Sequence, residues 1–108
     1  MQDIFNQLRE YKMKRFTVNA IKWFDKANGN TYHSCLVIRH RDGKTLACPY
    51  TYGYGDCYQQ TALEAMKKAD WIRPRLGELY SYDRLHNYPM IWIVSHGLKR
   101  ECIANGGE

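Results

Sequence analysis

Hydrophobic and polar positions follow two periods along the first half of the chain. Apolar side chains recur at helical spacing in residues 2–12, which predicts a short amphipathic helix there. From residue 15 to 51 the pattern alternates as in strands, and Asn28-Gly29 and Asp42-Gly43 interrupt it. Both dipeptides favour tight hairpin turns. The stretch therefore predicts a three-stranded antiparallel meander with strands near 15–26, 30–41 and 44–51.

Two-residue turns would fix the register of these strands, placing Ala20 opposite Val37 and Cys35 opposite Tyr50. One face of the sheet then collects the side chains that we expect to meet the core. These are Phe16, Val18, Ala20, Phe24, Cys35, Val37, Leu46, Cys48 and Tyr50.

The opposite face carries an apolar patch made of Ile21, Trp23, Leu36 and Ile38. The patch is larger than a monomer usually leaves exposed, so another element of this chain or a second subunit should cover it. We expect a homo-oligomer that forms through this face. Trp23 is the best candidate for the anchor of the interface because large aromatic side chains dominate binding energy at such sites.

The second half of the chain predicts one main helix and further strands. Residues 57–70 place Tyr58, Ala62, Ala65 and Ala69 on one face, and Asp56 with Gln59 resembles a capping box. Residues 73–88 read as a long ordered connection with at most one weak helical turn. PMIWIVS predicts an interior strand, and residues 98–104 a last strand. We therefore expect a single α+β domain over 1–108, an antiparallel meander of three to five strands with the main helix packed on it.

Composition favours an anionic partner. The chain of 108 residues has a formal net charge of +5, a pI near 9.1 and nine tyrosines. Basic surfaces attract nucleotides, nucleic acids and acidic protein surfaces. No segment approaches the roughly 18 consecutive apolar residues of a membrane helix, and no signal-peptide pattern opens the chain. A cytosolic location, without membrane contact, is the expectation.

Four cysteines, Cys35, Cys48, Cys57 and Cys102, raise the questions of disulfides and of zinc. Reduced, mostly buried thiols are expected in the cytosol. His33 and Cys35 would share a strand face, but C-x-x-C pairs typical of structural zinc sites do not occur. We predict neither a metal nor a cofactor.

The stretch TYGYGD, residues 51–56, allows three interpretations: a phosphate-binding loop, a stacking platform for a base, or a corner between a strand and a helix. A carboxylate from Asp56 would compete with phosphate for the N–H groups at the helix start. Tyr52 and Tyr54 could present a ring to a partner. The plainer alternative is that Tyr52 packs on the helix while the glycines redirect the chain.

Catalytic motifs do not occur in the sequence. His33 and His40 are seven residues apart on one predicted strand, an odd separation that directs them to opposite faces. Paired histidines could cleave RNA, so a small ribonuclease remains the least favoured alternative. We expect a protein that is not an enzyme.

Candidate ligand-binding residues combine positive charge with aromatic rings. Arginines could contact phosphate or carboxylate groups, and tyrosines could supply contact surfaces. The candidates are Arg39, Arg41, Arg73, Arg75 and Arg84, with Tyr52, Tyr54, Tyr80 and Tyr82.

Two stretches resemble small, mostly uncharacterised proteins encoded by bacteriophages and prophages: WFDKANGNTYHS at residues 23–34, and YGYGD before an alanine-rich helix. The resemblance covers about residues 14–71. It implies a phage accessory protein in the cytosol of a host bacterium, acting by binding and countering host defence, either as an inhibitor of a defence protein or by sequestering a nucleotide signal. A basic nucleic-acid-binding module is the alternative.

Overall fold

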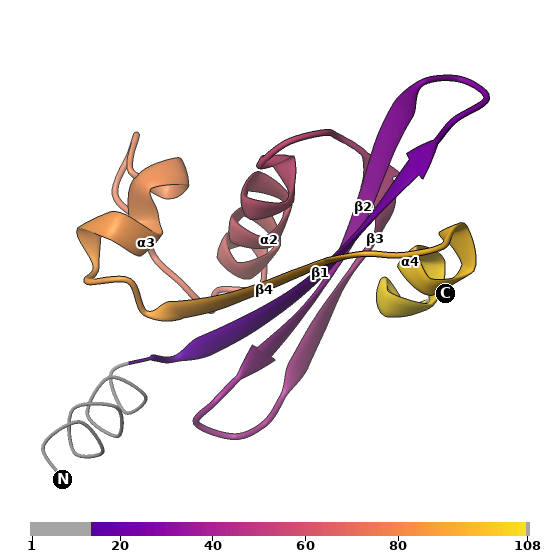
Figure 1. Ribbon diagram of the computed structural model, residues 1–108. Coiled ribbons are helices and arrows are strands. Elements are labelled where there is room, and N and C mark those ends of the chain that lie inside the picture. The colour runs from indigo at the N-terminus through magenta and orange to yellow at the C-terminus, as the bar shows by residue number, and fades with distance from the viewer. Residues whose placement is uncertain (1–13, 108) are drawn as a thin grey trace, which may run out of the picture.

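The computed structural model describes residues 14–107, and the helix expected over residues 2–12 lies outside the described residues. Figure 1 shows an α+β fold in which α2 and α4 lie on opposite faces of one sheet. The elements in chain order are β1 (Phe16–Asp25), β2 (Asn30–Arg39), β3 (Thr45–Tyr52), α2 (Cys57–Lys68), the 3-10 helix η1 (Leu79–Ser81), α3 (Tyr82–Leu85), β4 (Met90–His96) and α4 (Lys99–Asn105).

The sheet is mixed. Strands β1, β2 and β3 form the predicted antiparallel meander, but the strand order is β3-β2-β1-β4 and β4 runs parallel to β1. The predicted antiparallel meander is therefore confirmed for β1, β2 and β3, but it does not extend to β4. The connection between α2 and β4 is long enough to carry the chain back across the sheet, as a parallel pairing requires. The hydrophobic pattern of β4 does not indicate whether the strand pairs parallel or antiparallel with its neighbour.

Both hairpins have wider loops than their turn dipeptides predicted. Asp25 pairs with Asn30, so Ala20 faces Cys35 and not Val37, and Cys35 faces Cys48 and not Tyr50. The predicted register is wrong by two residues in each hairpin, and by one residue beyond the β-bulge of β3. A shift by an even number leaves each side chain on its face of the sheet, and most of the predicted core face is therefore correct.

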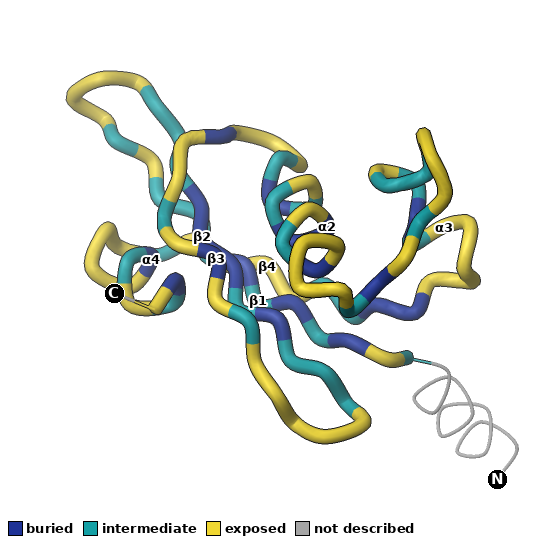
Figure 2. The backbone as a smooth tube through the Cα atoms, turned by 180° about the vertical axis from the view of Figure 1, so that it is seen from behind, coloured by how far each residue is buried: buried dark blue, intermediate teal, exposed yellow. Residues whose placement is uncertain are grey.

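The core lies between α2 and the sheet. From the expected face, Phe16, Val18, Ala20, Cys35, Val37 and Cys48 are buried. From the helix face expected in the sequence, Tyr58 and Ala62 are buried and Ala65 is half-buried against the core, whereas Ala69 is exposed. The prediction is therefore correct in part: it missed Leu63 and Met66, whose larger side chains are also buried over the strands. Figure 2 shows the buried positions concentrated near α2, with exposed hairpin tips.

Two residues expected in the core lie elsewhere. Phe24 is 54% exposed because β1 and β2 extend beyond α2 towards their hairpin. Tyr50 changes faces at a β-bulge in β3, where the register shifts between His33 and Cys35. Its ring stacks on that of Tyr32 at 4.8 Å, measured between ring centroids.

Residues 98–104, predicted as a last strand, mainly form helix α4. The Glu101 carboxylate accepts a hydrogen bond from the Leu98 N–H at 2.7 Å, which stabilises the start of the helix. Helix α4 packs on β1, β2 and β3, and Asn105 Nδ2 donates to the Asn19 carbonyl at 3.0 Å. It covers part of the face that carries Ile21, Trp23, Leu36 and Ile38, all four of which are half-buried.

Strand β4 lies at an edge of the sheet, so its predicted interior position is wrong. Met90 is buried and Ile91 and Trp92 are half-buried, but residues 93–96 are exposed. An apolar run alone does not distinguish a strand with two neighbours from one with a single neighbour.

Candidate anion-binding pocket

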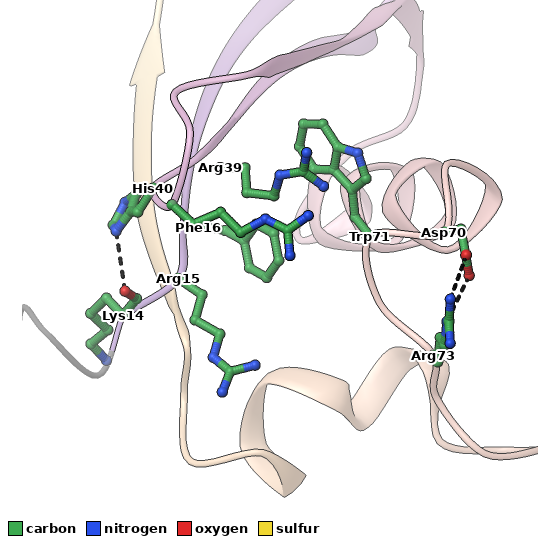
Figure 3. A pocket seen from close by; sticks show the side chains of 9 residues that line it. Lys14, Arg15, Phe16, Arg39, His40, Asp70, Trp71 and Arg73 are labelled. Atoms are coloured by element: carbon green, nitrogen blue, oxygen red, sulfur yellow. Dashed lines mark hydrogen bonds and ion pairs between the residues drawn. The ribbon is translucent and has the colours of Figure 1, made fainter.

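A basic pocket of about 870 Å³ lies where the start of β1, the end of β2 and the segment after α2 meet. In Figure 3, Arg15, Phe16, Arg39 and Trp71 lie at the centre, Asp70 and Arg73 lie across from them, and His40 and Lys14 lie at the margin. The lining residues are Lys14, Arg15, Phe16, Arg39, His40, Arg41, Asp70, Trp71 and Arg73.

Strand pairing and one backbone reversal bring these residues together. Phe16 pairs with Arg39, and the His40 N–H donates to the Arg15 carbonyl at 2.9 Å. After α2, Asp70 takes a positive φ of 61°, and the Trp71 N–H donates back to the Met66 carbonyl at 2.8 Å. The reversal directs Trp71 towards β1 and β2.

Trp71 already contacts two groups of this chain. Its ring stacks on Phe16 with 6.2 Å between centroids and an interplanar angle of 13°. The Arg39 guanidinium carbon lies 4.6 Å from the centroid of the same ring, a cation–π distance. The pocket therefore offers a ligand mainly charge and hydrogen-bond donors, with little free aromatic surface.

Two carboxylates hold two of the arginines in place. Arg39 donates to both Asp42 oxygens at 3.1 and 2.6 Å, and Arg73 donates to both Asp70 oxygens at 3.0 and 2.8 Å. The hydrogen bonds from Arg39 lower the pKa of Asp42 to about 2. Arg73 likewise lowers the pKa of Asp70. Both carboxylates are thus ionised at neutral pH and orient the guanidinium groups.

The other lysine and arginine side chains of the pocket make fewer or longer contacts with acceptor groups than Arg39 and Arg73 do. Lys14 Nζ donates to the Tyr88 carbonyl at 2.6 Å, and Arg41 Nε lies 4.0 Å from an Asp42 oxygen with its side chain 78% exposed. Arg15 is also exposed. Five basic side chains against Asp70 in the lining, with Asp42 beside it, leave the pocket strongly positive. Such a cluster suits phosphate or carboxylate groups.

Three of the arginines predicted from the sequence, Arg39, Arg41 and Arg73, line this pocket. Arg75 and Arg84 are exposed and lie outside its lining. Lys14, Arg15 and Trp71 were missed as ligand-binding candidates. Arg15 could have been predicted from the β1–β2 hairpin, because an antiparallel hairpin places the start of its first strand beside the end of its second.

The predicted tyrosines do not converge on the pocket. Tyr82 is buried and its ring stacks on His86 at 4.1 Å, so it does not fit the expected role of an exposed contact ring. The Tyr80 hydroxyl donates to Glu64 at 2.5 Å. Tyr54 is 67% exposed, and Tyr52 is 58% exposed at the far end of the sheet.

The TYGYGD stretch forms the corner between β3 and α2. Asp56 stands at the helix start, but its carboxylate forms no capping hydrogen bond, so the predicted capping box is wrong. Gly53 packs against buried His33, whose Nδ1 lies 3.0 Å from the Gly53 oxygen and whose Nε2 lies 2.6 Å from Thr61 Oγ1. His33 thus fastens the strand to the helix.

A second surface, which we call the aromatic group, consists of Trp23, Tyr32, Tyr50 and Tyr52. Trp23 stacks on Tyr32 at 5.5 Å, and Tyr52 meets Tyr32 edge-on at 5.8 Å. Lys99 Nζ lies 5.4 Å from the Trp23 ring centroid. This group is near the β1–β2 hairpin, at the opposite end of β1 from the basic pocket.

Within the described part of the chain, three or more His, Cys, Asp or Glu side chains do not gather into a group that could hold a metal ion. Cys35, Cys48 and Cys102 are buried as expected, and all four thiols are free. Among residues 14–107, helices long and apolar enough to cross a bilayer are absent.

Searches of protein-family models, curated proteins and solved structures found no match to this chain.

Proposed function

We propose that the protein acts by binding an anionic, phosphate-bearing partner in the basic pocket, and that it is a non-enzymatic phage accessory protein directed against host defence in the bacterial cytosol. One observation carries the proposal of anion binding: cationic side chains from the segment just before β1, from the end of β2 and the turn that follows it, and from the segment after α2 line a common pocket. The phage context rests on the sequence resemblance.

Phosphate is the favoured ligand chemistry for a geometric reason. Arg39 and Arg73 are held by carboxylates, so their guanidinium groups are already oriented before a ligand arrives. Orientation in advance reduces the entropy cost of binding. Because Trp71 is occupied by Phe16 and Arg39, phosphate groups should contribute more to affinity than a nucleobase.

The ribonuclease alternative loses support from the placement of the histidines. His33 is 1% exposed, and each ring nitrogen lies within hydrogen-bond distance of a group of this chain. His40 lies 2.7 Å from Thr17 Oγ1, on the other side of the sheet. The two imidazoles therefore do not form a general acid–base pair.

Calorimetric titration tests the proposal with inorganic tripolyphosphate, nucleoside triphosphates and short nucleic acids. Arg15→Glu and Arg41→Glu should each weaken binding about tenfold or more, because each reverses a charge at the pocket. Arg100→Glu is the matched control, since Arg100 is an exposed arginine in the first turn of α4, away from the pocket. A glutamate there is compatible with the helix dipole. Equal losses in all three variants, or no binding of any anion, would contradict the proposal.

A nucleic-acid-binding module is the second candidate, and the exposed side chains of Arg41 and Arg73 favour it because they could follow a phosphate backbone. Its affinity should fall steeply with salt, with a log–log slope of about −0.9 for each phosphate neutralised on a duplex. Arg15→Glu combined with Arg41→Glu should reduce the slope by about two. A flat salt response for nucleic acid, alongside tight binding of a nucleotide, would instead favour sequestration of a small signal.

A further inference from the structure

Among residues 14–107, strand β4 leaves an unpaired edge on the sheet. It pairs with β1 on one side and lies last in the strand order β3-β2-β1-β4. The exposed residues include Ile93, 50% exposed, and Val94, 38% exposed. Unpaired edges of apolar strands readily pair with another strand.

The hydrogen bonds at both ends of β4 show which backbone groups point outwards. The Pro89 carbonyl accepts from the Arg15 N–H at 2.6 Å, and the Gly97 N–H donates to the Lys22 carbonyl at 2.9 Å. Both groups therefore point towards β1. Because backbone groups alternate along a strand, those of Trp92, Val94 and His96 point away from β1.

The open edge has defined limits. At its start, the outward N–H of Met90 donates to Asp83 Oδ1 at 3.2 Å, so α3 already occupies that position. At its end, Gly97 turns the chain into α4, which packs on β1, β2 and β3. Within residues 14–107, Trp92, Val94 and His96 have no strand partner on their outer side.

The two edges of the sheet differ in their protection. Edge strand β3 contains Pro49 at a bulge, and both features discourage pairing with another strand. Strand β4 has no proline, and it contains no lysine, arginine, aspartate or glutamate. Two copies of a chain with net charge +5 repel each other, and an edge without formal charges is where that repulsion is weakest.

We propose that two copies of this chain pair antiparallel through their β4 strands, with a two-fold axis at Val94, and so form one continuous sheet. This register pairs all the outward groups: Val94 faces Val94 of the second copy, and Trp92 faces His96. Each of these residues exchanges two main-chain hydrogen bonds with the one opposite. On the other face, Ile93 lies beside Ser95 of the second copy and becomes shielded from water.

The pairing has a consequence for the basic pocket, and this part rests on the proposed function. An axis perpendicular to the sheet puts both α2 helices, and both pockets, on the same face. Phe16, at the pocket, pairs with Met90. Met90 of one copy lies about eight residue steps along the strand from Met90 of the other, or roughly 26 Å at ~3.3 Å per residue. A polyanion that spans this distance should bind more tightly than tripolyphosphate.

Sedimentation velocity over a concentration series into the high micromolar range tests the dimer. The unmodified chain should change from monomer to dimer, and Val94→Lys should remain monomeric because it places two ammonium groups opposite each other. The exposure of Val94 lets the lysine head reach water, so the variant should fold. Thr51→Lys, at an exposed position of edge strand β3, is the matched control and should dimerise normally.

A charge-swap mixture makes the test specific to this register. Val94→Lys and Val94→Glu should each be monomeric alone and should form a heterodimer when mixed, because only a two-fold axis at this residue places them opposite each other. Far-ultraviolet circular dichroism checks that each variant is folded. A monomer at every concentration would overturn the proposal, and so would a dimer that Val94→Lys leaves intact. Either result is independent of whether any anion binds.

Discussion

Replacing Gly53 by alanine should destabilise the fold by about 2–4 kcal/mol, which combines an overpacking cost of about 1–3 kcal/mol with weakened buried hydrogen bonds of similar cost. A Cβ atom at this position would lie 2.7 Å from His33 Cε1 and 2.9 Å from Cys57 Cβ. His33 cannot move freely, since it is 1% exposed and its ring lies within hydrogen-bond distance of Gly53 and Thr61. Moving the ring relieves the clash but breaks those contacts, so the two costs do not simply add.

Urea denaturation followed by tryptophan fluorescence measures this effect as a lower midpoint with an unchanged slope. Gly55→Asn is the control: that glycine has φ of 60° and open space around its Cβ position, and asparagine tolerates this conformation. It should cost less than about 1 kcal/mol. In a His33→Ala background, Gly53→Ala should cost less than it does alone. If the free energy of unfolding of Gly53→Ala lies within about 0.5 kcal/mol of that of the unmodified protein, Gly53 is not packed as tightly as we infer.

Three further predictions concern the pocket and helix α4. Asp42→Asn should strengthen tripolyphosphate binding severalfold in calorimetry, because it removes a negative charge beside the pocket while the amide oxygen of asparagine still accepts a hydrogen bond that orients Arg39; weaker binding would contradict this prediction. The same carboxyl, with its pKa lowered to about 2, stabilises the folded state above about pH 4 and loses that effect as pH falls towards 2. Acid titration should therefore show a shallower loss of stability in Asp42→Asn than in the unmodified chain, and identical slopes would contradict this. Asn105→Ala should destabilise the chain by about 1–2 kcal/mol, because Asn105 links α4 to the Asn19 carbonyl and to Ser34. The fluorescence of Trp23 should also change, because Lys99 of α4 lies over its ring. An unchanged urea midpoint would refute the link.

The sequence predicted the parts of the fold that local patterns encode. Alternation and the two glycine turns located β1, β2 and β3, and helical spacing located α2. The register differed by two residues because each loop is wider than its turn dipeptide, yet side-chain faces were retained up to the β-bulge at which Tyr50 changes faces. The connection over 73–88 contains only η1 and α3, as its weak pattern predicted.

The remaining elements depend on tertiary structure. Whether MIWIVSH lies inside the sheet or at its edge is decided by the path of the chain after α2, which periodicity does not describe. The weak alternation of residues 98–104 is compatible with a strand. Helix α4 forms instead because the Glu101 carboxylate accepts a hydrogen bond at the helix start and the helix packs on β1, β2 and β3.

The candidate site was only partly predictable for the same reason. Arg39 and Arg41 stand out as charges next to a turn, and their pocket is visible only after β1 is paired with β2. Trp71 reaches the pocket through the positive φ of Asp70, a conformation that aspartate adopts more often than most residues but that no pattern in the sequence marks. The prediction that all four tyrosines are contact residues for a ligand was too broad, since Tyr82 is buried.

The most direct test of anion binding in the basic pocket uses the three indole N–H signals in a two-dimensional NMR spectrum. Trp71 lines the pocket, Trp23 belongs to the aromatic group, and Trp92 donates to Asp83 at 2.9 Å. Titration with tripolyphosphate should shift the Trp71 signal in a saturable way and leave those of Trp23 and Trp92 in place. A Trp71 signal that does not move, or a larger shift at Trp23, would contradict the account.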